Sequence, residues 1–295
     1  MFANDLLVAT AIIGALAGLA FIAGRQVHAN RKWLFISTIF VAVVFSNFFQ
    51  GNLGWANLMP HSSAVLLSNL TPILVAFIAG FSCNGMVVSK RSRPFLVSTL
   101  SVLGVICLVA PLIRPAFAPP SVNDVGELDG FVILQSHDST CAPASAATLL
   151  RLNGIESSEK EMVGPCLTSE FGTEALGLYR GLKLGARGHG KDVRVAGNDP
   201  YLWSIEGQLP NVALVLFPED EFGQSVDRSE LHQLADRWTA PNWFFGSPGE
   251  EDGHAVVIVG YADGKWTIAD PAIGLVKWSD QEFRARFTGD AIYID

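Results

Sequence analysis

The sequence predicts an α+β domain, with helices followed by an antiparallel sheet, preceded by an all-α region of four transmembrane helices. Three observations lead to this prediction: an uneven distribution of charge, four long charge-free runs near the start, and a later change from helical to strand patterning. Residues 1–120 contain 7 Lys or Arg and 1 Asp or Glu, whereas residues 121–295 contain 13 and 27. The two parts therefore suit different environments.

The four charge-free runs are each close to the length needed to cross a hydrocarbon layer of roughly 30 Å as a helix. Only a helix satisfies its own backbone polar groups in lipid. A cleaved signal peptide is the alternative for the first run, but such peptides begin with positive charge and the early charge here is Asp5. We expect an integral, multi-pass membrane protein in the lipid bilayer, with spans at Leu6–Gly24, Trp33–Phe49, Ala64–Cys83 and Phe95–Ile113.

The loops between these runs differ in positive charge, which predicts their orientation. The loop Gln50–Ser63 has no Lys or Arg, whereas the first and third loops are basic. The positive-inside rule places the basic loops in the cytoplasm, so the region after the fourth span is expected to be extracytoplasmic. The charges concerned are Arg25, Arg31, Lys32, Lys90, Arg91 and Arg93.

Small and polar residues within the runs suggest how the helices pack. Gly14 and Gly18 form a G-x-x-x-G pair, which either brings two helices close together or is incidental in an Ala/Gly-rich helix. Asn69 and Pro72 either line a pathway or mark a kinked helix whose polar group bonds a neighbour, which is the commoner arrangement.

The proline-rich segment Arg114–Gly130 predicts an extended tether. We expect a membrane region at residues 1–116, a linker at 117–130 and a folded domain at 131–295. Within the domain a helix is expected to open near Cys141, with Ser139 or Thr140 as its cap. The other predicted elements are helices at Ser158–Val163 and Thr173–Leu184, then strands at Val212–Phe217, His254–Tyr261, Trp266–Ala269 and Ala291–Ile294.

Three residues of this domain have the chemistry of a thiol-based active site. Cys141 lies in the first turn of its predicted helix, where the positive end of the helix dipole stabilises a thiolate. His254 opens a strand and can act as the base. Asp270, at the end of the next strand, can fix the tautomer of the imidazole and stabilise its positive charge.

The hairpin between these strands gives a geometric test. A strict two-residue turn at Asp263-Gly264 pairs Val257 with Asp270 and places His254 on the opposite face of the sheet. A longer loop or a bulge restores a common face. We therefore predict an irregularity in this hairpin.

A donor for the negative oxygen of an attacked carbonyl is also available. Gln135 stands six residues before Cys141. Its side-chain amide and the backbone N–H of Cys141 could together form an oxyanion hole.

The motifs Gln135-x5-Cys141-Ala-Pro-Ala, Gly253-His254-Ala-Val-Val-Ile-Val-Gly and Ile268-Ala-Asp270-Pro271 together resemble the bacteriocin-processing, double-glycine cysteine peptidases of the papain-like clan. The resemblance covers residues 131–295. It implies an α+β fold in which a helix bearing Cys packs on an antiparallel sheet bearing His and Asp. It also implies Cys141 as nucleophile, His254 as base, Asp270 as its orienting partner and Gln135 in the oxyanion hole.

The resemblance further implies a peptide or small-protein substrate cut after a Gly-Gly-type site. Ala142 departs from the glycine common after the family's cysteine. The ATP-binding cassette domain of the best-known members is also missing from this sequence, so a separate export transporter is a possible partner.

Other classes of function fit less well. Nucleic acid is not expected as a partner, because the C-terminal region is strongly acidic. We expect no metal and no cofactor, since the histidines lack a zinc-site spacing with any cysteine pair. The segment Gly185–Lys191 resembles a phosphate-binding loop, but Asp192 stands where Ser or Thr would be needed.

Three alternatives remain open from the sequence. A disulfide between Cys141 and Cys166 would remove the nucleophile. A non-catalytic module could use the same cleft to bind peptide or act as a sensor. Another Cys-His-Asp acyl-transfer enzyme, such as a cell-wall amidase or a transglutaminase-like protein, could carry the same three groups.

Overall fold

The computed structural model describes residues 4–27, 32–83, 89–122, 128–218 and 251–295. The chain divides into two compact units. The first comprises Met1–Asn52 and Ser63–Ile113, and the second comprises Leu53–Ser62 and Arg114–Asp295.

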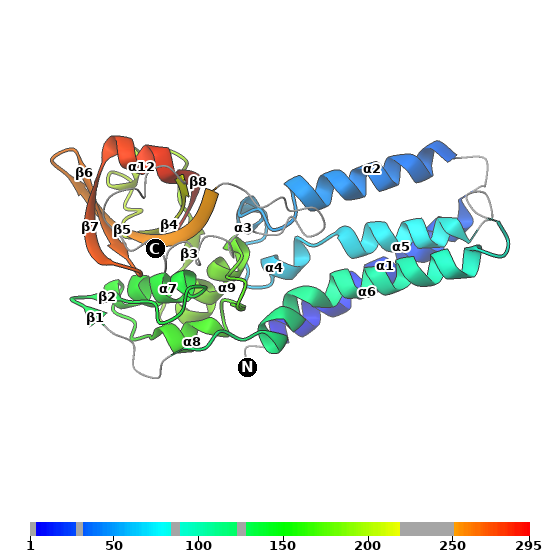
Figure 1. Ribbon diagram of the computed structural model, residues 1–295, viewed down its shortest axis with the longest axis horizontal. Helices are drawn as coiled ribbons and strands as arrows, with labels where there is room; N and C mark the ends of the chain where they lie inside the picture. The colour runs from blue at the N-terminus through cyan, green and yellow to red at the C-terminus, as the bar shows by residue number, and fades with distance from the viewer. Residues whose placement is uncertain (1–3, 28–31, 84–88, 123–127, 219–250) are drawn as a thin grey trace. The chain divides into compact units, whose positions relative to one another are not determined.

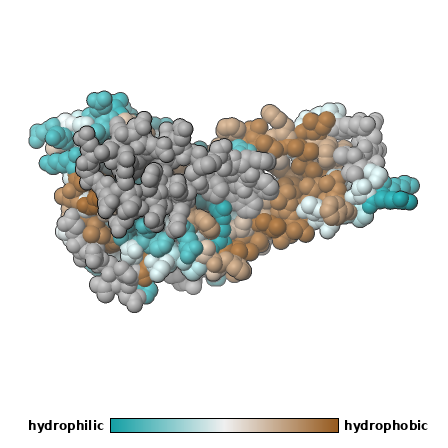
Figure 2. Space-filling view, viewed as in Figure 1, coloured by the Kyte–Doolittle hydropathy of each residue, from teal (hydrophilic) through white to brown (hydrophobic). Residues whose placement is uncertain are grey.

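The first unit is helical, and Figure 2 shows apolar side chains over its helices. Its helices are α1 (Asn4–Gln26), α2 (Lys32–Phe48), α4 (Ala64–Leu67), α5 (Thr71–Ser82) and α6 (Arg93–Phe117).

Among the described residues, three segments are long and apolar enough to cross a membrane: Asn4–Gln26, Ala64–Ser82 and Arg93–Phe117. Helix α2 coincides with the expected second span, Trp33–Phe49, within one residue, and the number of spans stays a prediction. Helix α2 has 17 residues. At about 1.5 Å per residue it extends about 25 Å, short of a hydrocarbon layer of about 30 Å.

The third apolar segment is interrupted between α4 and α5. Pro72 lies in the first turn of α5, where a proline is tolerated because its missing N–H would have no helical partner. The side chain of Asn69 at the break donates to the carbonyl of Cys107 in α6 at 2.8 Å. That carbonyl needs an outside donor because Pro111, four residues later, has no N–H. The expected bond from the polar group to a neighbouring helix is confirmed.

The close helix contact in this unit is not made by the predicted Gly14 and Gly18. A Cβ on Gly18 would meet nothing within 4 Å, and one on Gly14 would lie 3.9 Å from a leucine side chain. Helices α1 and α5 instead approach at Gly24 and Gly80. A Cβ on Gly80 would lie 2.0 Å from the carbonyl oxygen of Phe21. The pair Gly14 and Gly18 is therefore incidental to the observed packing.

The expected tether after the last apolar run begins later than predicted. Helix α6 continues through Pro115 to Phe117. A proline removes only its own donor, and the next turn still closes, since Ala118 N donates to the carbonyl of Arg114 at 3.0 Å.

The second unit contains a six-stranded antiparallel sheet with the order β3-β8-β4-β5-β6-β7 (Figure 1). Its strands are β3 (Val193–Val195), β4 (Asn211–Pro218), β5 (Glu251–Ala262), β6 (Lys265–Asp270), β7 (Gly274–Ser279) and β8 (Phe287–Ile294). A separate hairpin joins β1 (Leu128–Asp129) and β2 (Val132–Ile133). The helices are α3 (Gly54–Leu58), α7 (Cys141–Leu152), α8 (Glu159–Val163), α9 (Ala175–Gly185), α10 (Pro200–Trp203) and α12 (Asp280–Arg286).

The predicted α+β fold is confirmed, with helices α7, α8 and α9 ahead of all six strands of the sheet in the sequence. The four strands expected from β-branched and aromatic runs are all present. Strands β3 and β7 and helix α12 were not predicted. Strands β3 and β7 are the two outermost strands. Strand β3 has three residues, and the exposed Leu275 interrupts the apolar–polar alternation in the sequence of β7.

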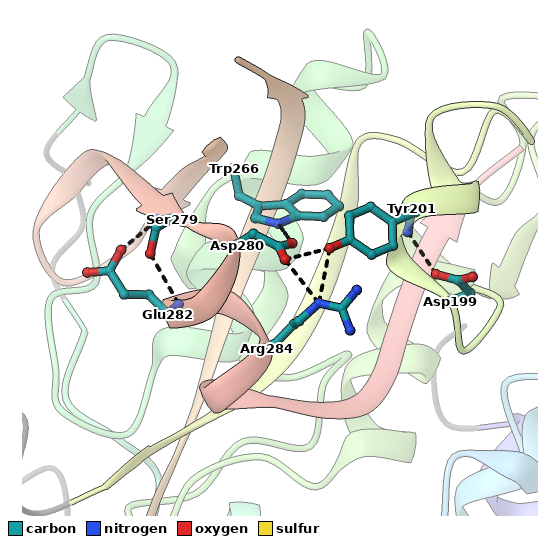
Figure 3. Close-up of polar contacts among 7 residues, drawn as sticks. All are labelled: Asp199, Tyr201, Trp266, Ser279, Asp280, Glu282 and Arg284. Atoms are coloured by element: carbon teal, nitrogen blue, oxygen red, sulfur yellow. Dashed lines mark hydrogen bonds and ion pairs between the residues drawn. The ribbon is translucent and has the colours of Figure 1, made fainter. Parts of the chain in front are cut away.

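One face of the sheet carries an aromatic core that includes residues of α10 and α12. Trp203, Trp266 and Phe283 are fully buried, and the rings of Trp266 and Phe283 lie 4.6 Å apart. At the edge of this core, Asp280 accepts hydrogen bonds from the indole of Trp266 and the hydroxyl of Tyr201 (Figure 3). These contacts fix α12 to the sheet.

Helix α9 lies against the turn that carries Cys166. A Cβ on Gly177 would lie 2.4 Å from the backbone carbonyl oxygen of Cys166. Replacing Gly177 by Ala is therefore expected to lower the free energy of unfolding by about 1–3 kcal/mol, because the backbone must move and this outweighs the helix propensity gained, about 0.5–1 kcal/mol. Denaturant unfolding of the purified full-length chain in detergent would measure the change.

Gly164→Ala is the matched control. Gly164 has a right-handed φ of −66°, and a Cβ there would meet nothing within 4 Å. Equal stability of the two variants would contradict the proposed close packing at Gly177.

Candidate active site

Cys141 is the first residue of α7, as predicted, and its side chain is 1% exposed. Helix α7 is held against the sheet by Ser145, whose hydroxyl donates to the carbonyl of Ala255 in β5 at 2.8 Å. The thiol is thereby placed at the positive end of a helix that packs on the strand bearing His254.

Thr140 is the N-cap residue of α7, but its hydroxyl does not cap the helix. It donates to the carbonyl of His137 at 2.6 Å and accepts from the N–H of His137 at 3.2 Å. The sequence had suggested only a capping role for this hydroxyl. In the structure it braces the loop that leads into Cys141.

The hairpin of β5 and β6 contains the predicted irregularity. Its turn is a strict two-residue turn, since Ala262 pairs with Lys265, and Asp263 and Gly264 both have positive φ. The register then shifts between Ile258 and Gly260, so that Val257 pairs with Ala269. This one-residue shift moves Asp270 onto the face that His254 occupies.

His254 and Asp270 are hydrogen bonded in the resulting arrangement. Nε2 of His254 lies 2.8 Å from Oδ1 of Asp270, and the same oxygen accepts from the N–H of Ala272 at 2.8 Å. Both side chains are buried. Because Nε2 is bound to the carboxylate, Nδ1 is left as the ring nitrogen for the contact with Cys141.

The imidazole is held in its protonated form. Burial lowers the pKa of His254, but the attraction of the Asp270 carboxylate, the hydrogen bond to it and the interaction with Cys141 outweigh burial and raise that pKa from 6.5 to about 10. An imidazolium between a carboxylate and a sulfur is suited to stabilising a thiolate.

This shift predicts how stability depends on pH. The folded protein holds the His254 proton more tightly than the unfolded chain, so the stabilisation is full below pH 6.5 and is lost as the pH rises through about 10. We expect the free energy of unfolding to fall across that range, by at most about 1.4 kcal/mol per pH unit for this one proton. Denaturant titrations at several pH values would measure the slope.

Asp270→Asn serves as the comparison for this measurement, because it removes the charge that most strongly raises the pKa of His254. Its slope across the same range should be shallower than that of the original protein. Identical slopes would show that His254 does not titrate as stated.

Gln135 lies beside the carboxylate end of the site. Its backbone N–H donates to the carbonyl of Pro271, next to Asp270, at 2.8 Å. Its side-chain Nε2 donates to the carbonyl of His137 at 3.3 Å, and an amide nitrogen carries a second hydrogen. In the structure Gln135 is thus hydrogen bonded both to the residue that follows Asp270 and to its own loop before Cys141. Its role as an oxyanion donor stays a prediction.

Two alternatives from the sequence are not supported by this geometry. Cys141 and Cys166 are both free thiols. Cys166 is buried, and burial raises its pKa to about 12. The glycine-rich segment Gly185–Lys191 follows the C-terminus of α9 and leads into β3, whereas a phosphate-binding loop precedes a helix N-terminus.

Residues 222–295 match the model of the Peptidase C39 family. The C-terminal part of this chain is C39-like. The match confirms the family resemblance seen in the motifs and supports a cysteine peptidase in general. The matched residues include His254 and Asp270, whereas Gln135 and Cys141 precede them.

The chain is also similar to individual proteins. An uncharacterized protein of Methanothermobacter marburgensis is 25% identical over 167 residues, which cover 57% of this chain and 89% of that protein. The peptidase domain of Streptococcus ComA, a bifunctional ABC transporter of a quorum-sensing pathway, is 20% identical, with a TM-score of 0.38 over 55% of this chain and 94% of that one. A double-glycine-motif protease from an AMS/PCAT transporter, solved with its leader peptide, is 20% identical, with a TM-score of 0.36 over 60% and 93%.

Proposed function

We propose that this protein is a membrane-anchored cysteine peptidase that hydrolyses peptide bonds in a peptide or small-protein substrate. The observation that carries the proposal is the meeting of Cys141, His254 and Asp270, which lie far apart in the sequence. The three groups supply a nucleophile, a proton carrier and an orienting carboxylate.

In the proposed mechanism, the thiolate of Cys141 attacks the carbonyl carbon of the scissile bond. The negative oxygen that forms accepts hydrogen bonds from the amide of Gln135 and the backbone N–H of Cys141. The His254 imidazolium donates its proton to the leaving amine. The imidazole then takes a proton from water, which hydrolyses the thioester and regenerates the thiolate.

The substrate we propose is a leader-type peptide cut after a Gly-Gly-type site. It is supported by the C39 family match and by the motifs shared with double-glycine peptidases. Residues 1–116 would anchor residues 131–295 to the bilayer through a linker at 117–130. The basic loops favour an extracytoplasmic catalytic domain, and a separate export transporter would deliver its substrate.

Incubating the purified full-length chain in detergent with leader-type peptides and with cell-wall fragments tests this function. We expect peptides that contain Gly-Gly to be cleaved, and we expect Cys141→Ala to abolish this cleavage. The amide bonds of the cell-wall fragments should stay intact. Cleavage of wall fragments alone would favour an amidase. Intact biological activity in Cys141→Ala would favour a non-catalytic peptide-binding module.

A further inference from the structure

Glu159, outside the three groups described above, is a buried carboxylate directed at the oxyanion side of the site. It is the first residue of α8, and its side chain is 1% exposed. Its Oε1 accepts a hydrogen bond from the backbone N–H of Ser136 at 2.9 Å. Its Oε2 has no hydrogen-bond partner in the part of the chain that the structure describes.

A role in the helix dipole alone does not explain this placement. An acidic residue in the first turn stabilises a helix from a solvent-exposed position. Glu161 in the same turn is exposed and completes a capping box with Ser158. Burying a carboxylate carries a free-energy cost, and the hydrogen bond from the N–H of Ser136 offsets part of it.

The hydrogen bond to Ser136 completes a clamp around Gln135. On one side, the N–H of Gln135 donates to the carbonyl of Pro271. On the other, the next residue in the chain donates to Glu159. Beyond it, Thr140 braces His137, whose carbonyl accepts from the Gln135 amide. The loop is therefore attached to α8, to the Asp270 segment and to the start of α7.

We propose that Glu159 is a positioning residue that holds Gln135 where its amide can donate to the oxyanion. This rests on the proposed function of Gln135 in acyl transfer. A donor acts in a transition state only when it lies about 2.7–3.1 Å from the position of the oxyanion, so loosening the loop should slow carbonyl attack while leaving the thiolate intact.

Two reagents that react with Cys141 separate these effects. In acetylation by p-nitrophenyl acetate, the S–C bond forms at a carbonyl, an oxyanion develops, and p-nitrophenolate leaves. In alkylation by iodoacetamide, the S–C bond forms at a saturated carbon, iodide leaves, and no oxyanion develops. Both reactions consume the thiolate, but only the first uses Gln135.

We expect Glu159→Ala in the full-length chain to slow acetylation of Cys141 by about 10- to 100-fold, up to the loss caused by misplacing a catalytic group by about 1 Å, and to leave alkylation unchanged. Glu159→Gln keeps an acceptor oxygen and should restore acetylation. Acetylation of Gln135→Ala should be slowed similarly. The double variant with both Glu159→Ala and Gln135→Ala should be acetylated no more slowly than Gln135→Ala alone. Glu156→Ala is the control, because that side chain is 90% exposed, and should match the original protein.

Proportionate slowing of both reactions in Glu159→Ala, additive losses in the double variant, or no change in acetylation would each overturn the proposal. If Glu159→Ala does not fold, the variants Glu159→Asp and Glu159→Gln are compared instead. Slow acetylation of Cys141 in Glu159→Asp alone, where the side chain is shorter, supports the proposal. Equal acetylation rates in the two variants overturn it. Failure of the peptidase function would show separately, as acetylation of Cys141 without hydrolysis of Gly-Gly peptides.

Discussion

Replacing His254 by Ala is expected to slow the hydrolysis of Gly-Gly peptides by about 10²–10⁴-fold and to slow the reaction of Cys141 with iodoacetamide at neutral pH by a smaller factor. Hydrolysis loses the general acid–base catalysis of the imidazole, which contributes a factor of this size, whereas alkylation loses only the stabilisation of the thiolate. Mass spectrometry of the labelled full-length chain measures the effect at Cys141 itself. Cys166 should stay unlabelled at neutral pH, because it is buried and its pKa is raised to about 12.

His189→Ala is a suitable control for the loss of an imidazole. His189 is exposed in the glycine-rich turn after α9, far along the chain from the three site residues, and its replacement should leave the labelling rate unchanged. Equally slow labelling of the original protein and of His254→Ala would show that His254 does not activate the thiol, and the proposed peptidase would lose its chemical basis.

Replacing Asp270 by Asn is expected to lower kcat for Gly-Gly peptides by about 10²–10⁴-fold while the protein stays folded. Asn keeps an oxygen that can accept from the N–H of Ala272, but it carries no charge to stabilise the imidazolium. The pKa of His254 should fall, so the alkaline limit of peptide hydrolysis, which needs the imidazolium proton for the leaving amine, should move to lower pH. A pH profile of hydrolysis separates this effect from a general loss of structure.

Asp263→Asn tests the same chemical change within the same hairpin. Asp263 has a φ of 52°, a left-handed conformation that Asn tolerates, and it lies in the turn of the hairpin, away from the strand ends that carry His254 and Asp270. Its activity and pH profile should match the original protein. An Asp270→Asn variant with an unshifted profile would show that Asp270 does not set the protonation of His254.

Much of the fold followed from local patterns. The position of Cys141 at a helix start, the helix predicted to begin at Ser158 and the hairpin turn at Asp263-Gly264 all depend on short-range chemistry that a sequence shows directly. Strand β7 was missed because Leu275, an apolar residue on its exposed face, interrupts the apolar–polar alternation in the sequence. The interrupted third apolar segment became interpretable only when Asn69 was seen to bond the Cys107 carbonyl.

The sequence likewise predicted the residues of the site that local patterns mark, and not the one that depends on packing. Residue types and spacing predicted Cys141, His254, Asp270 and Gln135 as candidates, and strand pairing in the hairpin required an irregularity, which the shift between Ile258 and Gly260 supplies. Glu159 gave no such signal. It lies in an ordinary acidic first turn, and its burial against Ser136 depends on how α8 packs beside the loop.

The sequence by itself determined the division into an apolar and an acidic part, the α+β class and the candidate reactive groups, because composition and periodicity are properties of each segment alone. The tertiary structure decided which groups touch: the bulge that turns Asp270 toward His254, the glycines at which α1 and α5 meet, and the clamp around Gln135. These features depend on distances between segments that are remote in the chain. Packing sets those distances, whereas local propensity does not.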